Sequence, residues 1–212
     1  MNKDSVPTSE EVFDVHFRNV EPSPWISRFA PLARKGGLVL DLAAGNGRHG
    51  RLLLKQGCRV VFIDRNTKAL DDLKGTKHAT VISANLEDGN DLFSCDGPLR
   101  ANTFDVIIIV NYLYRPIIGS LINALSTGGI LLYETFARGN EDFARPRNPD
   151  HLLRNGELLD HISGKLQIIA YEHGRLETTD IPGVKQRICA INNLHVSARQ
   201  DGDPETHSLF PS

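Results

Sequence analysis

Cysteine is scarce in this chain, which has three cysteines among its 212 residues. Cys58, Cys95 and Cys189 are odd in number and widely spaced, which excludes a disulfide framework and a CxxC metal site. Cys58 and Cys189 lie in apolar runs typical of strands, so we interpret them as inert thiols of the core.

Long apolar runs are also missing. No stretch approaches the roughly 20 apolar residues that a membrane-spanning helix needs. The N-terminal stretch MNKDSVPTSEEVFD has no apolar core of the kind that signal peptides carry. We therefore expect a cytoplasmic protein without a membrane segment.

An excess of one charge is the third feature that the sequence lacks. It has 24 basic and 26 acidic residues, for a formal net charge of −2. In the arginine-rich stretch 138–157, four arginines alternate with four acidic residues, so no basic face for a nucleic acid is indicated. The histidines show no HExxH spacing and no GxSxG elbow is present, so we expect neither a metal site nor hydrolase chemistry.

The length fits one α/β domain and is too short for a nucleotide domain plus a full-sized second domain. Residues 1–10 and 197–212 are polar, rich in Pro, Ser, Asp and Gly, and without apolar periodicity. We interpret them as mobile tails around a single domain at residues 11–196.

Short β-branched runs alternate with helical patterns through this domain, which predicts a parallel sheet. Helices are expected from Gly47 to Gln56, from about Asn66 to Gly75, and from Arg115 to the Gly128-Gly129 pair, followed by a broken helix in HLLRNGELLDHI. The seven expected strands are 38–42, 60–64, 80–84, 104–110, 130–136, 166–171 and 187–194.

The last two strands are separated by a loop of about a dozen residues and not by a crossover helix, which favours an antiparallel hairpin at one edge. The predicted fold is therefore α/β and Rossmann-like, with a seven-stranded, mostly parallel sheet, helices on both faces and an antiparallel C-terminal hairpin strand.

Gly45, Gly47 and Gly50 match GxGxxG between a strand and a helix, and Asp64 ends the next strand. Taken alone, this pattern is a dinucleotide fingerprint and suggests an NAD(P)-dependent oxidoreductase. Asp41 argues against that interpretation, because a carboxylate at the end of the first strand repels a diphosphate and attracts a ligand that carries an ammonium and a sulfonium. The alternative for Asp41 is a cap on the following loop.

The stretch LDLAAGNGR resembles the signature of class I S-adenosylmethionine-dependent methyltransferases. This resemblance implies S-adenosylmethionine as cofactor, with Asp64 binding both ribose hydroxyls. Asn85-Leu86-Glu87 lies where the class usually has an Asp or Glu near the adenine, and Asn at the first position departs from that pattern. The implied cofactor residues are Asp41, Ala43, Gly45, Gly47, Asp64, Arg65, Asn85, Leu86 and Asn111.

Further segments are similar to a small bacterial group of methyltransferases that is distantly like the tellurite-resistance type. These segments are NYLYRP, YETF, RPRNPDHLL, GELL and QRICA. NYLY lacks both prolines of the NPPY-like tetrapeptide of amino-group methyltransferases, so we do not infer adenine methylation.

The acceptor is expected at the carboxyl ends of the fourth and fifth strands, where an open parallel sheet binds its ligands. Tyr112 and Tyr114 are candidates for an aromatic face near the sulfonium, with packing under the next helix as the alternative. Glu134 is the candidate base, with capping of the following loop as its alternative.

Three more side chains have two interpretations each. Arg115 and Arg145 are either ligands of an anionic acceptor or braces of a loop, and His49 either faces the pocket or lies on a solvated helix face. Residues 137–150, with two X-Pro steps and few apolar side chains, are expected to form a mobile lid that brings Phe143 and Arg145 toward the pocket, the alternative being a static loop.

The sequence thus predicts a methyltransferase that acts on a small-molecule acceptor, as a monomer or homodimer, with Glu134, Tyr112 and Tyr114 as candidate catalytic residues. An NAD(P)-binding oxidoreductase and a catalytically silent nucleotide-binding regulatory protein remain as alternatives.

Overall fold

The computed structural model describes residues 21–211 apart from 91, 95–96, 100–102, 143, 178–181 and 197–198. The tail predicted at residues 1–10, Cys95 and Phe143 lie outside the described residues. None of the helices in the described part of the chain has the length and hydropathy of a bilayer-spanning segment.

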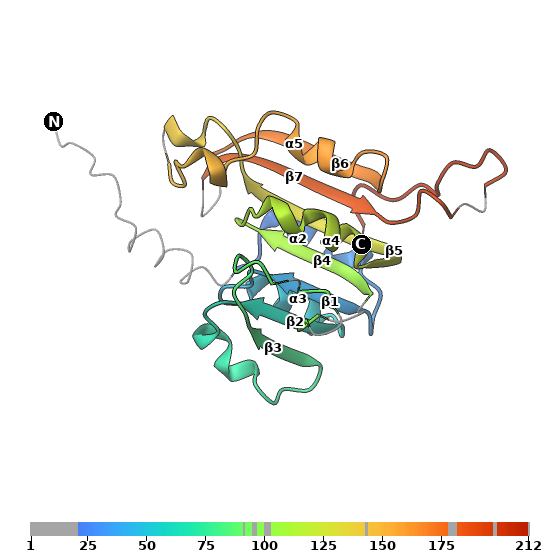
Figure 1. The fold of residues 1–212 in the computed structure, drawn as a ribbon. Coiled ribbons are helices and arrows are strands. Elements are labelled where there is room, and N and C mark those ends of the chain that lie inside the picture. Colours follow the sequence, from blue (N-terminus) through green and yellow to red (C-terminus); the bar gives the residue numbers. More distant parts are fainter. Residues whose placement is uncertain are drawn as a thin grey trace.

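The molecule is built on one seven-stranded sheet in the order β3-β2-β1-β4-β5-β7-β6 (Figure 1). Neighbouring strands are parallel from β3 to β5, whereas β7 is antiparallel to both β5 and β6. The predicted mostly parallel sheet with an antiparallel C-terminal hairpin is confirmed. The strands are β1 (Leu38–Leu42), β2 (Arg59–Asp64), β3 (Ala79–Ser83), β4 (Phe104–Val110), β5 (Leu125–Phe136), β6 (Gln167–Leu176) and β7 (Gly183–Ile191).

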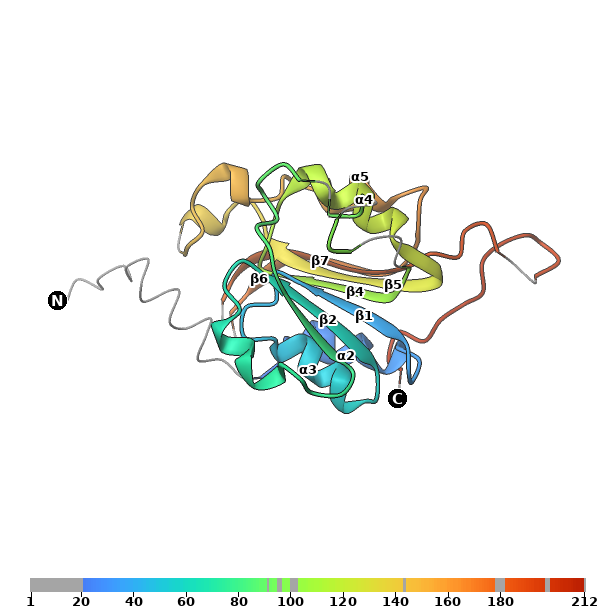
Figure 2. The same cartoon turned by 60° about the horizontal axis from the view of Figure 1, so that its bottom comes forward.

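Helices cover both faces of the sheet, with α2 and α3 on one side and α4 and α5 on the other (Figure 2). The α-helices in the described residues are α2 (Pro24–Phe29), α3 (Arg48–Lys55), α4 (Ile118–Asn123) and α5 (Glu157–Ile162). Short 3-10 helices are η1 (Ala30–Leu32), η2 (Lys68–Leu73), η3 (Arg115–Ile117), η4 (Asn140–Asp142) and η5 (Pro149–His151).

Two apolar cores follow from this layering, because successive strand residues point to opposite faces. Leu40 and Leu42 of β1 belong to the core under α4 and α5, whereas Val39 belongs to the core under α2 and α3. Asp41 is on the same face of β1 as Val39 and is therefore buried toward α3.

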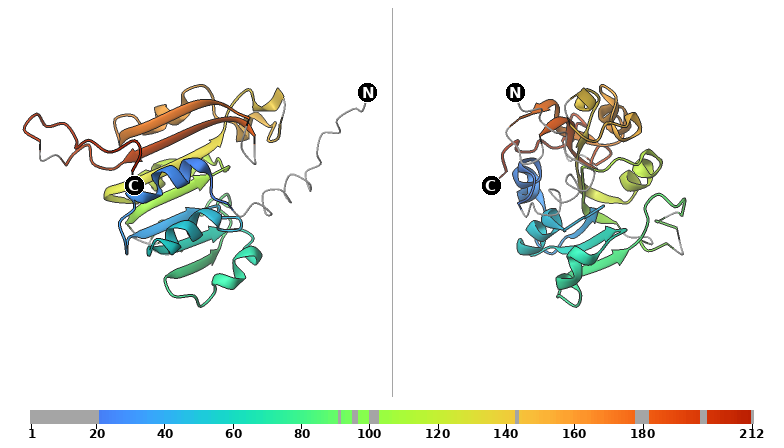
Figure 3. Two further views of the ribbon diagram at one scale, coloured as in Figure 1. Left: turned by 180° about the vertical axis from the view of Figure 1, so that it is seen from behind. Right: turned by 90° about the vertical axis from the view of Figure 1, so that its left-hand side faces the viewer.

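Helix α2 was not predicted from the sequence. Its start has the usual signals, since the Ser23 hydroxyl accepts a hydrogen bond from the Trp25 amide at 3.2 Å and Pro24 occupies the first turn. Trp25 and Phe29 pack edge to face, with ring centroids 4.8 Å apart, and both side chains are buried. The left view of Figure 3 shows this helix lying on the sheet.

Two helix predictions were wrong, one in the type of helix and one in its extent. The segment after Asn66 forms the 3-10 helix η2 in place of an α-helix. The helix after Pro116 ends at Asn123, and Leu125 already pairs with Phe104 as part of β5. A side chain at Gly129 would lie 2.7 Å from the Phe104 carbonyl oxygen, so this glycine permits the close approach of two strands at an irregularity in the ladder.

The C-terminal hairpin is longer than predicted, because β6 continues to Leu176 and β7 begins at Gly183. Beyond it, the described part of the predicted C-terminal tail contacts the body of the molecule. Arg28 of α2 donates to the Leu209 carbonyl at 2.9 Å, and its guanidinium lies 4.5 Å from the ring centroid of Phe210.

Candidate functional site

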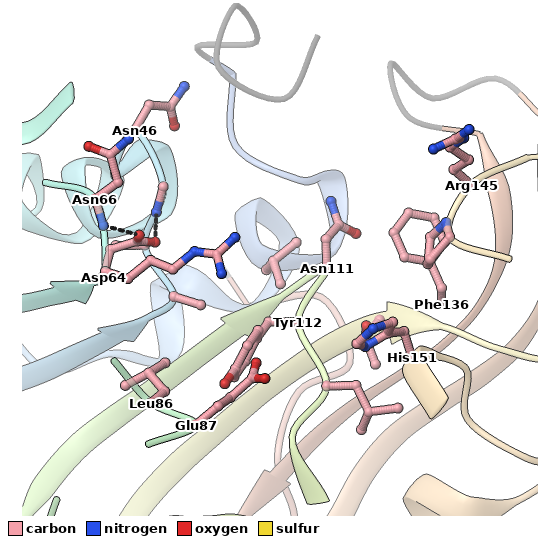
Figure 4. Close-up of a pocket in the computed structure, with 18 of the residues that line it drawn as sticks. Asn46, Asp64, Asn66, Leu86, Glu87, Asn111, Tyr112, Phe136, Arg145 and His151 are labelled. Carbon is pink, nitrogen blue, oxygen red and sulfur yellow. Dashed lines mark hydrogen bonds between the residues drawn. The ribbon is translucent and has the colours of Figure 1, made fainter. Parts of the chain in front are cut away.

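A cavity of about 1090 Å³ lies over the carboxyl ends of the parallel strands (Figure 4). In the sheet β1 lies between β2 on one side and β4 on the other, so this edge contains the topological switch point where open α/β sheets bind ligands. The segments that line the cavity are 43–46, 48–49, 64–66, 85–87, 110–113, 135–136, 145–148 and residue 151.

The loop after β1 is bent by two residues in the left-handed region, Ala43 at φ 53° and Gly45 at φ 58°. The Ala44 amide donates to the Ile63 carbonyl at 3.1 Å, and the Gly45 amide donates to Asp64 Oδ2 at 2.8 Å. A side chain at Gly45 would have no atom within 4 Å, so this glycine leaves open space beside the backbone.

The Asp64 carboxylate joins the ends of β1 and β2. Besides the bond from Gly45, its Oδ1 accepts from the Asn66 amide at 2.9 Å (Figure 4). A carboxylate has about four acceptor positions, so these two backbone bonds leave capacity for ligand hydroxyls on the cavity side. Arg65 follows it in the wall.

Gly47 and Gly50 are packing residues and do not line the cavity. A side chain at Gly47 would come within 2.7 Å of Leu70, and one at Gly50 within 2.4 Å of the Phe62 ring. These glycines let α3 pack closely on β2.

Asp41 also lies outside the cavity lining, beneath the start of α3. Its Oδ2 accepts from the Gly50 amide at 2.8 Å, which agrees with the capping alternative. Burial raises the pKa of Asp41 to about 7 against the opposing effect of the Gly50 amide, and the nearby Asp64 adds to the rise.

The segment after β3 forms the next part of the wall. Asn85 Oδ1 accepts from the Glu87 amide at 3.1 Å, so its oxygen closes a local turn, while Leu86 is buried against the core. Tyr112 lies beside Glu87 and Leu86 (Figure 4). Burial and the neighbouring Glu87 raise the pKa of Tyr112 above its usual range, which keeps this phenol neutral.

Asn111, directly after β4, has a left-handed backbone with φ 57°, a conformation that Asn tolerates better than most residues. Its Oδ1 accepts from Lys185 Nζ at 2.9 Å. An ammonium has only donors, so it fixes the amide oxygen of Asn111 on its own side and directs the amide donors elsewhere.

Lys185 forms a buried ion pair with Glu134, at 2.7 Å between Nζ and Oε1, and the other carboxylate oxygen accepts from the Ser23 hydroxyl at 2.7 Å. Burial raises the pKa of Glu134, but the Lys185 ammonium and the Ser23 bond outweigh it, so the pKa lies below its usual value. Burial likewise lowers the pKa of Lys185 against the opposing effect of Glu134.

His49 is a buried part of the cavity wall, with 5% of its surface exposed. Within the described residues, no hydrogen-bond partner reaches its Nε2. Burial lowers the pKa of His49 to about 3, and the nearby cations of Arg48 and Lys185 add to this effect. The imidazole is therefore neutral, and the solvated-face interpretation is wrong.

Residues 145–148 and His151 form the far wall (Figure 4). Their segment is held by Asn140, which is fully buried. Asn140 Oδ1 accepts from the Val184 amide at 3.2 Å, and Nδ2 donates to the Ala144 and Pro146 carbonyls at 3.4 and 2.9 Å. Arg145 therefore projects from backbone that is anchored to β7.

Arg115 has the bracing role and does not line the cavity. Its Nε donates to Glu157 at 2.5 Å, and its terminal nitrogens donate to the Asp150 and Leu152 carbonyls at 2.6 and 2.9 Å. These bonds fix the chain that follows the far wall.

Comparison with known proteins bears directly on this arrangement. Residues 39–129, which include the β1 loop, Asp64, the turn at Asn85 and Asn111, match a family model described as a methyltransferase domain. The likeness to that domain covers somewhat less than half of the chain. A comparison with curated protein sequences found no match.

Solved structures of methyltransferases share the fold of this chain at low sequence identity. TehB from Haemophilus influenzae aligns with a TM-score of 0.64 and 19% identity over 87% of this chain and 67% of that chain. N-methyltransferase NodS from Bradyrhizobium japonicum WM9, in complex with S-adenosyl-L-homocysteine, aligns with a TM-score of 0.60 and 16% identity over 85% of this chain and 96% of that chain. Plantazolicin methyltransferase BamL, also in complex with S-adenosyl-L-homocysteine, aligns with a TM-score of 0.60 and 16% identity over 87% of this chain and 91% of that chain.

The predicted class I methyltransferase fold and the likeness to the tellurite-resistance type are confirmed by these matches. The acceptors of the individual neighbours do not carry over to this chain, because at these identities the likeness concerns the fold alone.

Seven of the nine predicted cofactor residues line the cavity, whereas Asp41 and Gly47 do not. The seven are Ala43, Gly45, Asp64, Arg65, Asn85, Leu86 and Asn111. Of the three candidate catalytic residues, Tyr112 lines the cavity. Tyr114 does not, and Glu134 faces Lys185 behind Asn111.

Lys185 was missed by the sequence interpretation. It occupies a strand position on the same face as Cys189 and Ile191, and a lysine among such residues needs a buried partner. Arg147 and His151 were also not predicted to face the cavity. Among the described residues, no group of three or more His, Cys, Asp or Glu side chains is arranged to hold a metal ion.

Proposed function

We propose that this protein is a methyltransferase that transfers the methyl group of S-adenosylmethionine to a small-molecule acceptor bound in the same cavity. The observation that supports this most directly is the Asp64 carboxylate at the end of β2, held by the Gly45 and Asn66 amides and open to the cavity. A cytoplasmic location and a monomer or homodimer are part of the proposal.

The donor set of the cavity fits the cofactor. Asp64 offers carboxylate oxygens to the two ribose hydroxyls, and the turn at Asn85 with the apolar side chain of Leu86 offers a surface for the adenine. The open backbone at Gly45 admits a flat nucleoside. The amide donors of Asn111 suit the carboxylate of the methionine portion.

The cavity is large enough for two molecules. Its volume of about 1090 Å³ exceeds the roughly 300 to 1000 Å³ typical of a pocket for one drug-sized ligand. The walls at Phe136 and Arg145 lie beyond the predicted cofactor contacts and remain for the acceptor (Figure 4).

When bound, S-adenosylmethionine supplies an electrophilic methyl whose bond to sulfur breaks, with its electron pair staying on sulfur, as the acceptor lone pair forms the new bond. The protein's task is to hold that lone pair in line and to exclude water. Tyr112 places an aromatic ring in the wall between Asn111 and Leu113, where a sulfonium is attracted to its face.

Glu134 does not act as a catalytic base in this proposal. Its carboxylate is ion-paired with Lys185, bonded to Ser23 and absent from the cavity lining. An acceptor that must lose a proton transfers it to water, because the low pKa of the buried His49 makes that imidazole a weak base.

Binding and turnover test this proposal in sequence. Thermal unfolding should shift upward with S-adenosylmethionine and S-adenosylhomocysteine and not with NAD or NADP, because a ligand of the native state stabilises it by about 2.7 kcal/mol at a hundred times its Kd. Mass spectrometry should then find a methylated product after incubation with cell extract. Stabilisation by NAD would favour an oxidoreductase, and cofactor binding without any product would favour a silent binding protein.

A further inference from the structure

Charge is unevenly distributed along the cavity. Both lining carboxylates, Asp64 and Glu87, are at the end formed by β2 and β3, where Arg65 also lines the cavity. The opposite wall carries Arg145, Arg147 and His151 and no carboxylate. In Figure 4, Asp64 lies on one side of Asn111, whereas Arg145 and His151 lie on the other.

The two arginines of the far wall have no ion pair among the described residues. Two carboxylates of the adjoining segments are already engaged. Glu141 accepts from Arg138 at 2.7 Å, and Glu157 pairs with Arg115. The charge of the two wall arginines is therefore available to a ligand in the cavity.

The position of these arginines is defined by their backbone. The buried Asn140 holds the carbonyls of Ala144 and Pro146, which flank Arg145, and Pro146 separates the two arginines. Holding the backbone before a ligand arrives reduces the entropy lost on binding, so this wall is better prepared than a free surface loop.

The lining between this wall and the cofactor end has no carboxylate and includes one cation, Arg48, at the start of α3. Phe136 contributes an aromatic ring, and Lys185, 4.9 Å from the centroid of that ring, is paired with Glu134. The neutral His49 adds no charge. An acceptor thus meets an apolar surface near the methyl donor and positive charge at its far end.

We propose that the acceptor is a small organic anion, with a carboxylate or phosphate group bound by Arg145 and Arg147 and a carbon skeleton packed on Phe136. Guanidinium groups match both oxyanions through paired hydrogen bonds. A cationic amine is disfavoured there, because like charges repel more strongly beside a protein wall than in bulk water. This inference rests on the proposed methyl transfer.

The reaction then balances simply. The acceptor's lone pair forms a bond to the methyl carbon, the carbon–sulfur bond breaks toward sulfur, and S-adenosylhomocysteine leaves. A proton on the acceptor atom, where there is one, passes to water. The anionic group that the arginines hold is a binding group and is unchanged.

Ion-exchange separation of a low-molecular-mass cell extract tests the inference. Each fraction is incubated with the wild-type protein and S-adenosylmethionine labelled in its methyl group, and label is followed into product. The acceptor is expected in the fraction retained by an anion exchanger. Transfer only to molecules in the flow-through, to those retained by a cation exchanger, or to macromolecules would overturn the inference and leave methyl transfer standing.

Variants then assign the charge recognition to residues. Arg145→Gln/Arg147→Gln should raise the KM for the active fraction at least about tenfold and change the KM for S-adenosylmethionine less than about twofold. Arg138→Gln, in the same segment but paired with Glu141 and outside the cavity lining, is the matched control and should behave like wild type. Wild-type kinetics in the double variant would contradict the inference. A wild-type protein that binds S-adenosylhomocysteine yet labels nothing in any fraction would contradict the proposed function itself.

Discussion

Lys185 Nζ lies 2.9 Å from Oδ1 of Asn111, so the edge hairpin orients a side chain of the cofactor wall. Lys185 is on β7, whereas Asn111 follows β4, and β5 lies between these two strands in the sheet. Because the ammonium takes the amide oxygen, the two N–H groups of Asn111 remain for the cavity. Lys185 thus acts through Asn111 as a positioning residue.

Lys185→Met should lower the affinity for S-adenosylhomocysteine about tenfold, since a misplaced amide loses a hydrogen bond to a charged group, on the order of 1.5 kcal/mol. It should also lower the free energy of unfolding by about 3 to 5 kcal/mol, because Glu134 is left buried without its partner. Calorimetry and urea denaturation measure the two effects.

Lys185→Met/Glu134→Gln separates positioning from stability. The neutral amide that replaces the Glu134 carboxylate still accepts from Ser23, so the double variant should regain most of the lost stability while its affinity for S-adenosylhomocysteine stays low. Wild-type affinity in this double variant would show that Lys185 serves stability alone.

Asn85→Asp should keep or strengthen cofactor binding. An aspartate at this position still accepts from the Glu87 amide and so preserves the turn, and a carboxylate accepts more strongly from the adenine amino group. Titration with S-adenosylhomocysteine gives the result, with Asn85→Ala as the variant that loses the turn. A marked loss of affinity in Asn85→Asp would place the adenine elsewhere.

Asp41 should make the stability of the protein fall as the pH rises toward neutrality. The pKa of Asp41 is about 7 in the folded state and 3.8 in the unfolded chain. The stabilisation that the protonated carboxyl gives to the folded state is therefore fully present below pH 3.8 and is lost as the pH rises through 7. Between pH 5 and pH 8, the free energy of unfolding should fall by on the order of 2 to 3 kcal/mol because of Asp41.

Asp41→Asn keeps an acceptor for the Gly50 amide and removes the titration. Urea denaturation at pH 5 and pH 8 should therefore show a smaller decrease for this variant than for wild type. The exposed Asp142→Asn serves as control. Equal decreases in Asp41→Asn and wild type would mean that Asp41 is ionised in the folded protein.

Segment 144–151 should become less accessible to trypsin when the cavity is filled. Arg147 is exposed in this wall and followed by Asn148, so the Arg147–Asn148 bond is the site to monitor. Cleavage after Lys165, in the turn before β6 and at the amino ends of the parallel strands, should not respond to the ligand. Equal rates at Arg147 with and without saturating S-adenosylhomocysteine would favour the static loop over a cofactor-linked lid.

The central strands could be predicted from the sequence, because a parallel strand that is covered by helices on both faces of the sheet consists of a nearly continuous run of apolar residues. The bounds of β1 and β4 were predicted without error for this reason. The start of β5 was not, since Leu125 continues the helical spacing of Leu121 and only its pairing with Phe104 makes it a strand residue.

The cofactor side of the site was predictable because its residues directly follow strands that lie next to one another. The other side depends on how the hairpin and the segment after β5 pack, which sequence spacing does not encode. Lys185 reaches Asn111 from a distant strand, and Arg147 and His151 reach the cavity only because Asn140 anchors their segment.

Calorimetric titration of S-adenosylhomocysteine into wild type and Asp64→Ala tests the central claim most directly. Wild type should bind the ligand at one site per chain, and Asp64→Ala should bind it at least about a hundredfold more weakly, because two charge-assisted hydrogen bonds, each on the order of 1.5 to 3 kcal/mol, are lost. Asp71→Ala, which removes an exposed carboxylate paired with Lys74, should bind like wild type. Unchanged affinity in a folded Asp64→Ala variant, or no binding by wild type, would contradict the assignment of this cavity to S-adenosylmethionine.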